Sequence, residues 1–584
     1  MNNDSLVSIR YLNFDGLINA GVSDFLMLNS ECSAMKNVWV SKIGRLEKVP
    51  GYSKTDTVII SASQSISPSA SPTSSTSGSP SISQSVSPSV SVSPSISPSA
   101  SPSSSISPSV SPPNSVSPSI SPSISPSMSP SISPSISPSI SPSISPSEGQ
   151  IIDGQSVNYL HNYYDTSTRV NYLLATSNSG ANLTLEYRTT GPWATIGSIS
   201  TTWDTYADSQ PSMANYLGRT FIVGYKSGTT YLPNAIIQAT TFKTSDGTML
   251  TSMPQGKYIV RYRDLIYVLH TYIGSTAYPT RAYYCDEPAA GSIAWTGVAT
   301  NFIEFGYDDG DLITGGVEAL DRLIVFKTNS MWKYDESSVE QISDIGCDSH
   351  RSIAKVNRIP YWYNKDGFWR WRGAQPELIS AKIQPFVDAM DQANPQNVVG
   401  VPYNGFEYRA FMGTLTVEGI TYINAWFCWD TRREKAYIRC TANPGKSVCV
   451  YSENGVRRAY FGDDDGWVYK FATKVDCVYD DAGSEIDSFF ITKALDYGVP
   501  EDTKLVNRMT VFAKYSAGMK VAVDVDNKGE FNEANTQIIK RNLDEMPLVA
   551  NGKLFRYRFY EKGKSKSWQF SGFVVKTKGT ESWD

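Results

Sequence analysis

Histidine is scarce in this chain, whose 584 residues contain only His161, His270 and His350. The three lie in unrelated contexts, and none has the spacing of a pair of zinc ligands. A zinc site or a serine–histidine–aspartate triad needs a histidine that a partner residue holds in place. We therefore expect each histidine to be an ordinary strand-end residue. We also expect no enzymatic activity, no metal site and no cofactor.

Paired cysteines and long apolar runs are missing as well. No two cysteines form a CxxC pair, and an odd total of seven is typical of reduced, mostly buried thiols made in a reducing cytoplasm. No apolar run reaches about 18 residues, and the opening MNNDSLVSIRYLNF has no signal-peptide core. The sequence therefore predicts a soluble protein without membrane insertion. The cysteines are Cys32, Cys285, Cys347, Cys428, Cys440, Cys449 and Cys477.

Charged and aromatic residues are absent between Asp56 and Glu148. About half of this stretch is serine, and proline recurs at every fourth position from Pro118 to Pro146. Such a composition cannot bury enough apolar surface to offset the entropy of ordering the backbone. We expect a long disordered Ser/Pro-rich insertion at 59–149, of polyproline II character.

An alternative for this insertion is an edge strand. From Ser115 to Ser147 serine takes every odd position, while proline alternates with isoleucine, valine or methionine at the even positions. An extended strand would place serine on one face and leave one edge able to pair with another subunit. Glycosylation of the dense serines is a further possibility.

The remainder of the chain is rich in β-branched and aromatic runs. Examples are YRDLIYVLHTY (262–272) and DRLIVFKTNSMWKYDE (321–336), in which short apolar segments flank tight turns. Similar hairpins recur at roughly 45 to 60 residues, a spacing typical of propeller blades. We expect an all-β fold: a β-propeller of about five to seven irregular blades with a C-terminal β-sheet region. A pair of β-sandwiches is the alternative.

These patterns divide the chain into four parts. An N-terminal β segment at 1–58 joins the propeller, and the Ser/Pro-rich linker at 59–149 follows it. The propeller body occupies 150–472, and a C-terminal β region at 473–584 closes the fold. A single helix interrupts the strands, because Ile383, Phe386, Val387 and Met390 have helical spacing.

The C-terminal stretch KLFRYRFYEKGKSKSWQFSGFVVKTKG (553–579) alternates basic with aromatic residues. In a strand, the arginines of FRYRFY lie on one face and the aromatic residues on the other. A repeated basic face near a DNA channel would hold the phosphate backbone without reading sequence, although an ordinary solvated face is the simpler interpretation. The candidate residues for contact with DNA or a partner, rather than for folding, are Arg556, Arg558, Lys564 and Lys566.

Acidic residues gather in IEFGYDDGD (303–311). Asp308, Asp309 and Asp311 form a candidate partner-facing loop, complementary to the basic stretch. The chain as a whole carries a net charge of −5, which does not favour wrapping nucleic acid.

Three further motifs resemble ligand sites incompletely. ANPGKS (442–447) lacks the first glycine of a phosphate-binding loop, and DVDNKGEFNE (524–533) has Lys528 at a ligand position of a calcium loop. A β-hairpin accounts better for the second motif. GDDDGW (462–467) gathers three carboxylates at a turn, where a bound cation is the less favoured alternative.

Several segments resemble propeller-type tail and head-completion proteins of tailed bacteriophages, a group that includes packaged-DNA stabilisation, stopper and nozzle-like proteins. The opening ECSAMKNVWVSKIGRLEKVPGY is similar to the asparagine-bearing strand, hairpin and Pro-Gly of that family. DRLIVFKTNSMWKYDE, followed by SDIGCDSHRSIAKVNRIPYWYNKDGFWRWRGAQPELISAKIQPFV, keeps the family's order of elements. NAWFCWDTRREKAY and GDDDGWVYKF resemble later blades, and ITKALDYGVPEDTKLVNRMTVFAK resembles the final sheet. The resemblance covers most of 1–57 and 150–584 but not the Ser/Pro-rich insertion.

The resemblance implies a structural protein of the virion, made in the host cytoplasm. It implies a ring of copies, usually six, below the portal, which seals the DNA channel and docks further tail proteins. Its expected partners are other copies of itself, the portal or adaptor, other tail proteins, and packaged DNA through non-specific backbone contacts. The alternative is a tail-fibre or adhesin protein whose propeller binds a host surface glycan, and a propeller hydrolase is a third possibility.

Overall fold

The computed structural model describes residues 7–12, 32–40, 45–55, 156–179, 182–196, 209–226, 230–247, 249–297, 299–514, 518–531, 536–541, 543–564 and 567–579. Contacts divide the chain into one unit of residues 1–58 with 145–584 and a second unit of residues 59–144. The second unit, and with it nearly all of the Ser/Pro-rich insertion, lies outside the described residues.

The fold is all-β, as the sequence predicts, and the described residues include seven four-stranded antiparallel sheets. The first sheet contains β6 (Val157–Asp165), β7 (Val170–Ser179), β8 (Asn182–Arg188) and β9 (Ala194–Thr195). The second contains β10 (Gln210–Tyr216), β11 (Arg219–Tyr225), β12 (Ala235–Gln238) and β13 (Thr241–Lys243). The third contains β14 (Gln255–Tyr262), β15 (Leu265–Ile273), β16 (Thr276–Tyr284) and β17 (Phe302–Glu304). The fourth contains β18 (Ile313–Ala319), β19 (Arg322–Lys327), β20 (Met331–Tyr334) and β21 (Val339–Ser343).

The other three sheets follow in chain order, with one exception. The fifth contains β22 (Ala354–Val356), β23 (Ile359–Asn364), β24 (Gly367–Trp371) and β25 (Pro376–Leu378). The sixth contains β26 (Gly400–Tyr403), β27 (Glu407–Val417), β28 (Ile420–Asp430) and β29 (Lys435–Cys440). The seventh contains β30 (Ser447–Glu453), β31 (Val456–Gly462), β32 (Val468–Phe471) and β5 (Tyr52–Lys54). The exception is β5, which precedes the insertion and pairs with β32.

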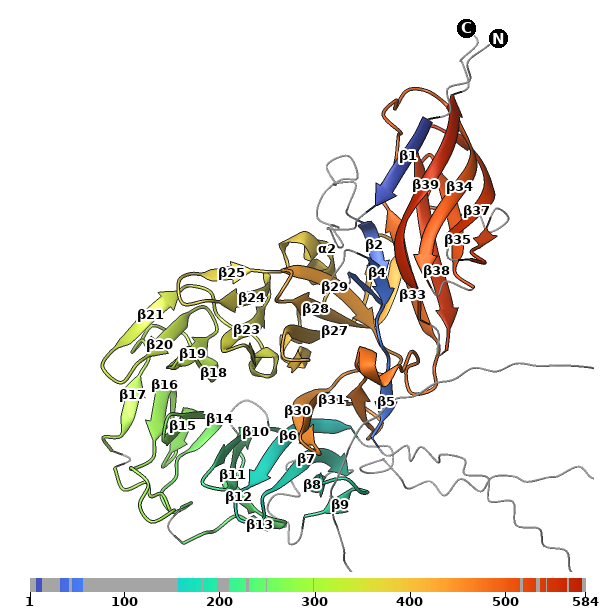
Figure 1. Cartoon of the computed structure of the whole chain (residues 1–584). Helices are drawn as coiled ribbons and strands as arrows, with labels where there is room; N and C mark the ends of the chain where they lie inside the picture. The colour runs from blue at the N-terminus through green and yellow to red at the C-terminus, as the bar shows by residue number, and fades with distance from the viewer. Residues whose placement is uncertain are drawn as a thin grey trace, which may run out of the picture. The chain divides into compact units, whose positions relative to one another are not determined.

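The seven sheets form a closed ring (Figure 1). The first strand of each sheet contacts the first strand of the next, from β6 through β10, β14, β18, β22 and β26 to β30. The ring closes because β30 also contacts β6. Apolar clusters fill the spaces between neighbouring sheets, so strands inside the ring such as β11 and β15 are buried on both faces.

Two larger sheets follow the ring. One has the order β3 (Val38–Val40), β4 (Leu46–Lys48), β39 (Gln569–Gly579), β34 (Lys504–Lys514) and β37 (Leu543–Gly552), with β1 (Val7–Leu12) also paired to β39. The other has the order β2 (Cys32–Lys36), β33 (Ile486–Thr492), β38 (Phe555–Gly563), β35 (Lys520–Val525) and β36 (Gln537–Ile538). Aromatic residues from the two sheets pack against each other, with the tilted rings of Phe559 and Phe570 4.7 Å apart between centroids, so the two sheets form a sandwich.

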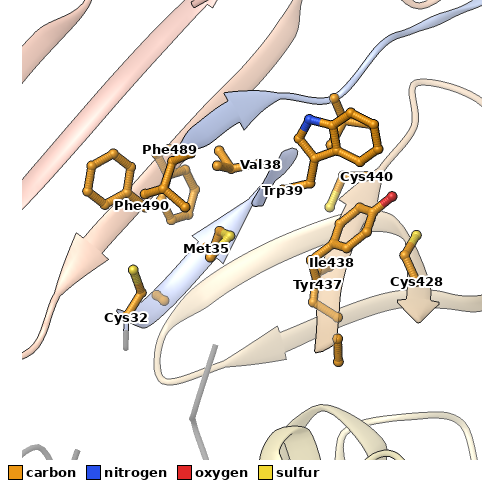
Figure 2. Close-up of a cluster of buried hydrophobic side chains, with 14 of the residues drawn as sticks. Cys32, Met35, Val38, Trp39, Cys428, Tyr437, Ile438, Cys440, Phe489 and Phe490 are labelled. Atoms are coloured by element: carbon orange, nitrogen blue, oxygen red, sulfur yellow. The ribbon is translucent and has the colours of Figure 1, made fainter. Parts of the chain in front are cut away.

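The N-terminal segment joins this sandwich to the ring (Figure 2). Met35 and Val38 are buried beside Phe489 and Phe490 of β33, and the ring of Trp39 meets Tyr437 of β29 edge to face at 6.5 Å. One continuous apolar core therefore extends from the fifth, sixth and seventh sheets into the sandwich.

Asn37 holds this joint by hydrogen bonds to both sides. Its Oδ1 accepts from the backbone N–H of Cys440 (2.7 Å), and its Nδ2 donates to the carbonyl of Asp487 (2.8 Å). The backbone of Asn37 is left-handed (φ 56°), a conformation that asparagine adopts more readily than most residues.

The predicted helix is confirmed at α2 (Gln384–Asp388), which follows the 3-10 turn η2 (Ala381–Ile383). All four residues of the apolar stripe are buried, and Phe386 packs edge to face on Tyr422 at 4.9 Å. Three further 3-10 turns are η1 (His350–Ser352), η3 (Pro395–Asn397) and η4 (Lys474–Asp476).

No helix among the described residues is long and apolar enough to cross a membrane. Five of the seven cysteines are buried, as the sequence predicts for most of them.

Candidate functional site

A cavity of about 600 Å³ lies at the centre of the ring. The first strand of every one of the seven sheets lines it, from Tyr159 and His161 on β6 round to Ser447 on β30. Two glycines of the lining allow close packing behind it, because a Cβ atom on Gly316 would lie 2.6 Å from Leu269 and one on Gly400 would lie 2.3 Å from the carbonyl of Ser352. The cavity therefore depends on the ring as a whole and not on one local motif.

Arg351, in η1, is one of four charged residues that line the cavity, with Arg261, Glu318 and Lys355. Its Nη1 donates to the carbonyls of Asn158 (3.3 Å) and Lys446 (3.0 Å), and its Nη2 donates to the carbonyl of Gln396 (2.9 Å). Asn158 belongs to the first sheet and Lys446 directly precedes the seventh, so Arg351 links the two sheets where the ring closes. The Nε atom is buried with no hydrogen-bond partner among the residues described.

His161 lines the same cavity from the middle of β6. Asn215 donates through Nδ2 to the carbonyl of Asn162, so its Oδ1 accepts from Nε2 of His161 at 2.9 Å. Burial lowers the pKa of His161 to about 4, although this hydrogen bond opposes the shift. His161 is therefore neutral at pH 7, with its proton on Nε2.

His350 lies beside Arg351 and faces the cavity from η1. Its ring lies 4.4 Å from that of Tyr258, and its Nε2 is 3.4 Å from Oγ of Ser212. Its Nδ1 is buried without a partner in the described part of the chain. Burial and the charge of Arg351 lower the pKa of His350 to about 4.

The histidines correct one expectation from the sequence. His161 and His350 are not isolated strand-end residues, because the ring brings them into one cavity although 188 positions of the numbering separate them. His270, outside this cavity lining, donates through Nδ1 to the carbonyl of Ile313 at 2.9 Å. No spacing in the sequence indicates that His161 and His350 share a cavity, because the closure of the ring brings them together.

Carboxylates are few around the cavity. Glu318 lines it and lies 3.3 Å from Nζ of Lys355, with both side chains partly exposed. Within the described residues, no group of three or more His, Cys, Asp or Glu side chains could hold a metal ion. The lining thus presents neutral imidazoles, amides and a buried guanidinium, which are suited to binding a polar or anionic group rather than a cation.

The basic stretch forms strand β38, and its aromatic residues Phe555, Tyr557 and Phe559 are buried as the alternation predicts. Arg556 is not on a solvated face, however. Its Nη2 lies 2.6 Å from Oδ2 of Asp524, whose carboxylate is fully buried. The strands β35 and β38 place these two residues opposite each other in register.

The other basic candidates differ among themselves. Arg558 is half-buried, with its guanidinium 4.6 Å from the ring of Phe489. Lys564 is exposed after the end of β38, and Lys566 lies outside the described residues. The structure therefore leaves Lys564 as the one described member of the four whose side chain is exposed.

Two of the three acidic candidates, Asp309 and Asp311, already have partners within the chain. Asp309 forms an ion pair with Lys327, whose Nζ is buried and also donates to the carbonyl of Phe305 at 2.9 Å. Asp311 accepts from the backbone of Asn329 (3.0 Å) and the hydroxyl of Ser330 (2.7 Å). Asp308 is exposed, and it alone of the three acidic candidates has no ion pair or hydrogen bond to another described residue.

The incomplete motifs have structural roles. Asp463 of GDDDGW accepts from the backbone of Trp467 (2.8 Å) and the hydroxyl of Tyr469 (2.8 Å), which orders the turn between β31 and β32. Asp524 likewise accepts from the backbone N–H groups of Lys528 and Gly529, each at 3.1 Å, at the turn after β35.

Comparisons with known proteins do not assign the chain to a family. No family model matches the chain, and no curated protein does. Among solved structures, the chain is similar to the crystal structure of BamB from Moraxella catarrhalis, with 11% identity over 55% of this chain and 83% of that one. The TM-score of 0.29 is too low to support any statement about function.

Proposed function

We propose that the ring is a seven-bladed β-propeller that serves as a structural component of a bacteriophage virion, in the tail or the head–tail connector. Each four-stranded sheet is one blade, and β5 completes the last blade from the N-terminal side. Copies of the chain assemble into a ring below the portal, seal the DNA channel and dock further tail proteins. The protein has a mechanical role and no enzymatic one.

The observation that carries the proposal is where the insertion leaves and re-enters the fold. The strand before it, β5, belongs to the seventh sheet, and the strand after it, β6, begins the first. These sheets are neighbours in the ring, and Nη2 of Arg188 on β8 donates to the carbonyl of Thr55 at 3.2 Å. Both ends of the insertion are thus anchored in one propeller, as in a loop, whereas an adhesin's stalk would be anchored at one end.

The continuous core between the ring and the sandwich also favours a mechanical role. An extended apolar core resists relative movement of its parts because separating them exposes apolar surface to water. The buried pairs Arg439–Asp481 and Lys48–Glu561 lie at the same joint. A protein that holds a channel against internal pressure needs such a joint.

Electron microscopy tests the proposal. The purified protein, alone and mixed with its portal, is imaged and scored for rings of several copies. Rings that stack coaxially on the portal are expected. Monomers that stay separate from the portal and bind glycans on an array would instead support the adhesin alternative and contradict the connector.

A further inference from the structure

Two cations without an ion-paired carboxylate among the described residues lie in and near the ring's cavity, Arg351 in its lining and Lys257 outside that lining. The first is Arg351, whose partners are three backbone carbonyls. The second is Lys257 on β14, whose Nζ lies 4.9 Å from the ring centroid of Tyr225. Neither forms an ion pair with any described acid, although the described part of the chain contains many other pairs.

Tyr225 is near both cations, with its ring against Lys257 and its hydroxyl close enough to act on Arg351. Burial lowers the pKa of Arg351, and the groups that oppose this shift are the side chains of Tyr225 and Tyr159 rather than carboxylates. Burial alone lowers the pKa of Lys257. Both side chains are therefore partly desolvated cations without an anionic partner, a costly arrangement in a folded protein.

The histidines near these cations supply no negative charge to balance them. His350 is next to Arg351, and the pKa of His270 is lowered by burial and by the positive charge of Lys257. Two hydrogen-bonding atoms, Nε of Arg351 and Nδ1 of His350, are buried without partners among the described residues. Arg351 and the two unused nitrogen atoms thus lie in the lining of a cavity with room for a polyatomic ligand, and Lys257 lies outside that lining.

We propose that this cavity binds a small oxyanion, of the phosphate, sulfate or carboxylate type, at Arg351, with Lys257 as a second positive charge nearby. The anion neutralises Arg351, accepts a hydrogen bond from its Nε and is attracted by the charge of Lys257. Because Arg351 links the first and seventh sheets, the bound anion stabilises the closure of the ring. This inference does not depend on the proposed virion function.

The test begins with the full-length protein dialysed into a chloride buffer. Sodium phosphate, sulfate and acetate are added separately, and binding is measured by isothermal titration calorimetry and by the melting temperature. We expect one anion per chain and a melting temperature that rises with anion concentration. An absence of binding for all three anions contradicts the proposal, and a preference among them identifies the type of oxyanion.

Substitutions locate the site. Lys257→Met should weaken binding by about tenfold or more, a change of about 1.4 kcal/mol, and Lys333→Met, which removes a surface pair with Glu340, is the matched control. Lys257 forms no hydrogen bond in the described structure, so this variant should fold even if Arg351→Met does not. Equal weakening by both lysine variants, or by neither, would overturn the site.

A direct observation uses crystals of the wild-type protein soaked in sodium selenate. An anomalous peak within hydrogen-bond distance of Arg351 supports the site, and a peak only at surface residues overturns it. Asp153, Asp204 and Asp208 lie outside the described residues, so an internal carboxylate is the competing occupant. If changing these three to Asn creates anion binding that the wild type lacks, the proposal is wrong.

Discussion

Nζ of Lys48 lies 2.6 Å from Oε2 of Glu561, and neither side chain is more than 5% exposed. The pair connects β4 of the N-terminal segment to β38 of the sandwich, across the core of the two C-terminal sheets. Lys48 also donates to the carbonyl of Gly563 at 3.1 Å, so two oxygen atoms accept hydrogen bonds from its ammonium group. Two parts of the chain more than 500 positions apart thus meet through one buried ion pair.

Lys48→Met should destabilise the protein by about 3 to 5 kcal/mol, because it leaves the Glu561 carboxylate buried without its partner. Denaturant unfolding followed by tryptophan fluorescence measures the loss. The double variant Lys48→Met, Glu561→Leu should recover most of the stability, since replacing both charges removes the desolvation cost. A double variant as unstable as the single one would show that the contact acts by packing and not by charge.

Glu186 should make the protein less stable as the pH rises. Its Oε2 is buried without a described partner, and burial raises its pKa to about 8 from an ordinary value of 4.5. Between these values the folded chain holds a proton that the unfolded chain has lost. The stabilisation is therefore complete below about pH 4.5 and disappears as the pH rises through 8. Glu186→Gln should flatten the dependence of melting temperature on pH in this range, and an unchanged slope would contradict the buried protonated state.

The three histidines should make the protein less stable as the pH falls. Burial lowers the pKa of His161, His270 and His350 to about 4, so the unfolded chain takes up protons on these side chains first as the pH falls below about 6.5. Stability is full above pH 6.5 and declines toward pH 4, at about 1.4 kcal/mol per pH unit for each histidine. Glu186 partly offsets this loss. His270→Gln should reduce the acid dependence measurably, and the same acid midpoint in the variant and the wild type would refute the assignment.

Arg556 and Lys564 should respond differently to removal of their charge. Arg556→Ser should cost about 3 kcal/mol because the buried carboxylate of Asp524 loses its cation. The exposed Lys564→Ser should change stability by less than about 0.5 kcal/mol. Thermal unfolding of the two single variants is the measurement. Equal effects would mean that Asp524 is satisfied by its turn alone.

Lys564 and Lys566 remain the better pair for testing assembly. On the proposed virion role, particles that carry Lys564→Ser and Lys566→Ser are expected to assemble less well or to lose DNA, more strongly as salt concentration rises. Infectivity and heat stability of the particles measure this effect. Unchanged particles at every salt concentration would leave these lysines as ordinary surface residues.

Deleting residues 63–146 and joining the ends by a short Gly-Ser link should leave the melting temperature within a few degrees. The strands on either side, β5 and β6, are each paired within the ring without any contribution from the deleted residues. Differential scanning calorimetry of the deletion variant gives the answer. A large fall in stability or solubility would indicate that the insertion packs as a strand, as the serine alternation allows.

Local patterns predict the local parts of this structure well. The alternation in FRYRFY places three aromatic residues in the core, and the spacing of Ile383, Phe386, Val387 and Met390 gives the buried face of α2. Both features arise within a few residues, where strand and helix geometry determine which side chains share a face. The all-β class follows from many such segments.

Pairings between distant segments could not be predicted in this way. Asp524 looks like part of a calcium loop, but the register of β35 on β38 places it against Arg556. The meeting of His161 with Arg351 in the cavity depends on seven sheets closing in sequence. Register and ring closure are set by packing across the whole fold, and no short window of sequence contains them.

The position of β5 has a consequence for synthesis on the ribosome. The seventh sheet takes its last strand from residues 52–54, yet the strand that receives it, β32, ends at Phe471. The same N-terminal segment supplies β2, β3 and β4 to the sandwich, which is not complete until β39 is made. Apart from the β3–β4 hairpin, which is local, this segment must therefore wait for its partner strands through most of translation, and pairings of such long sequence separation form slowly. Chains that terminate before β32 lack these partner strands and can complete neither the seventh sheet nor the sandwich.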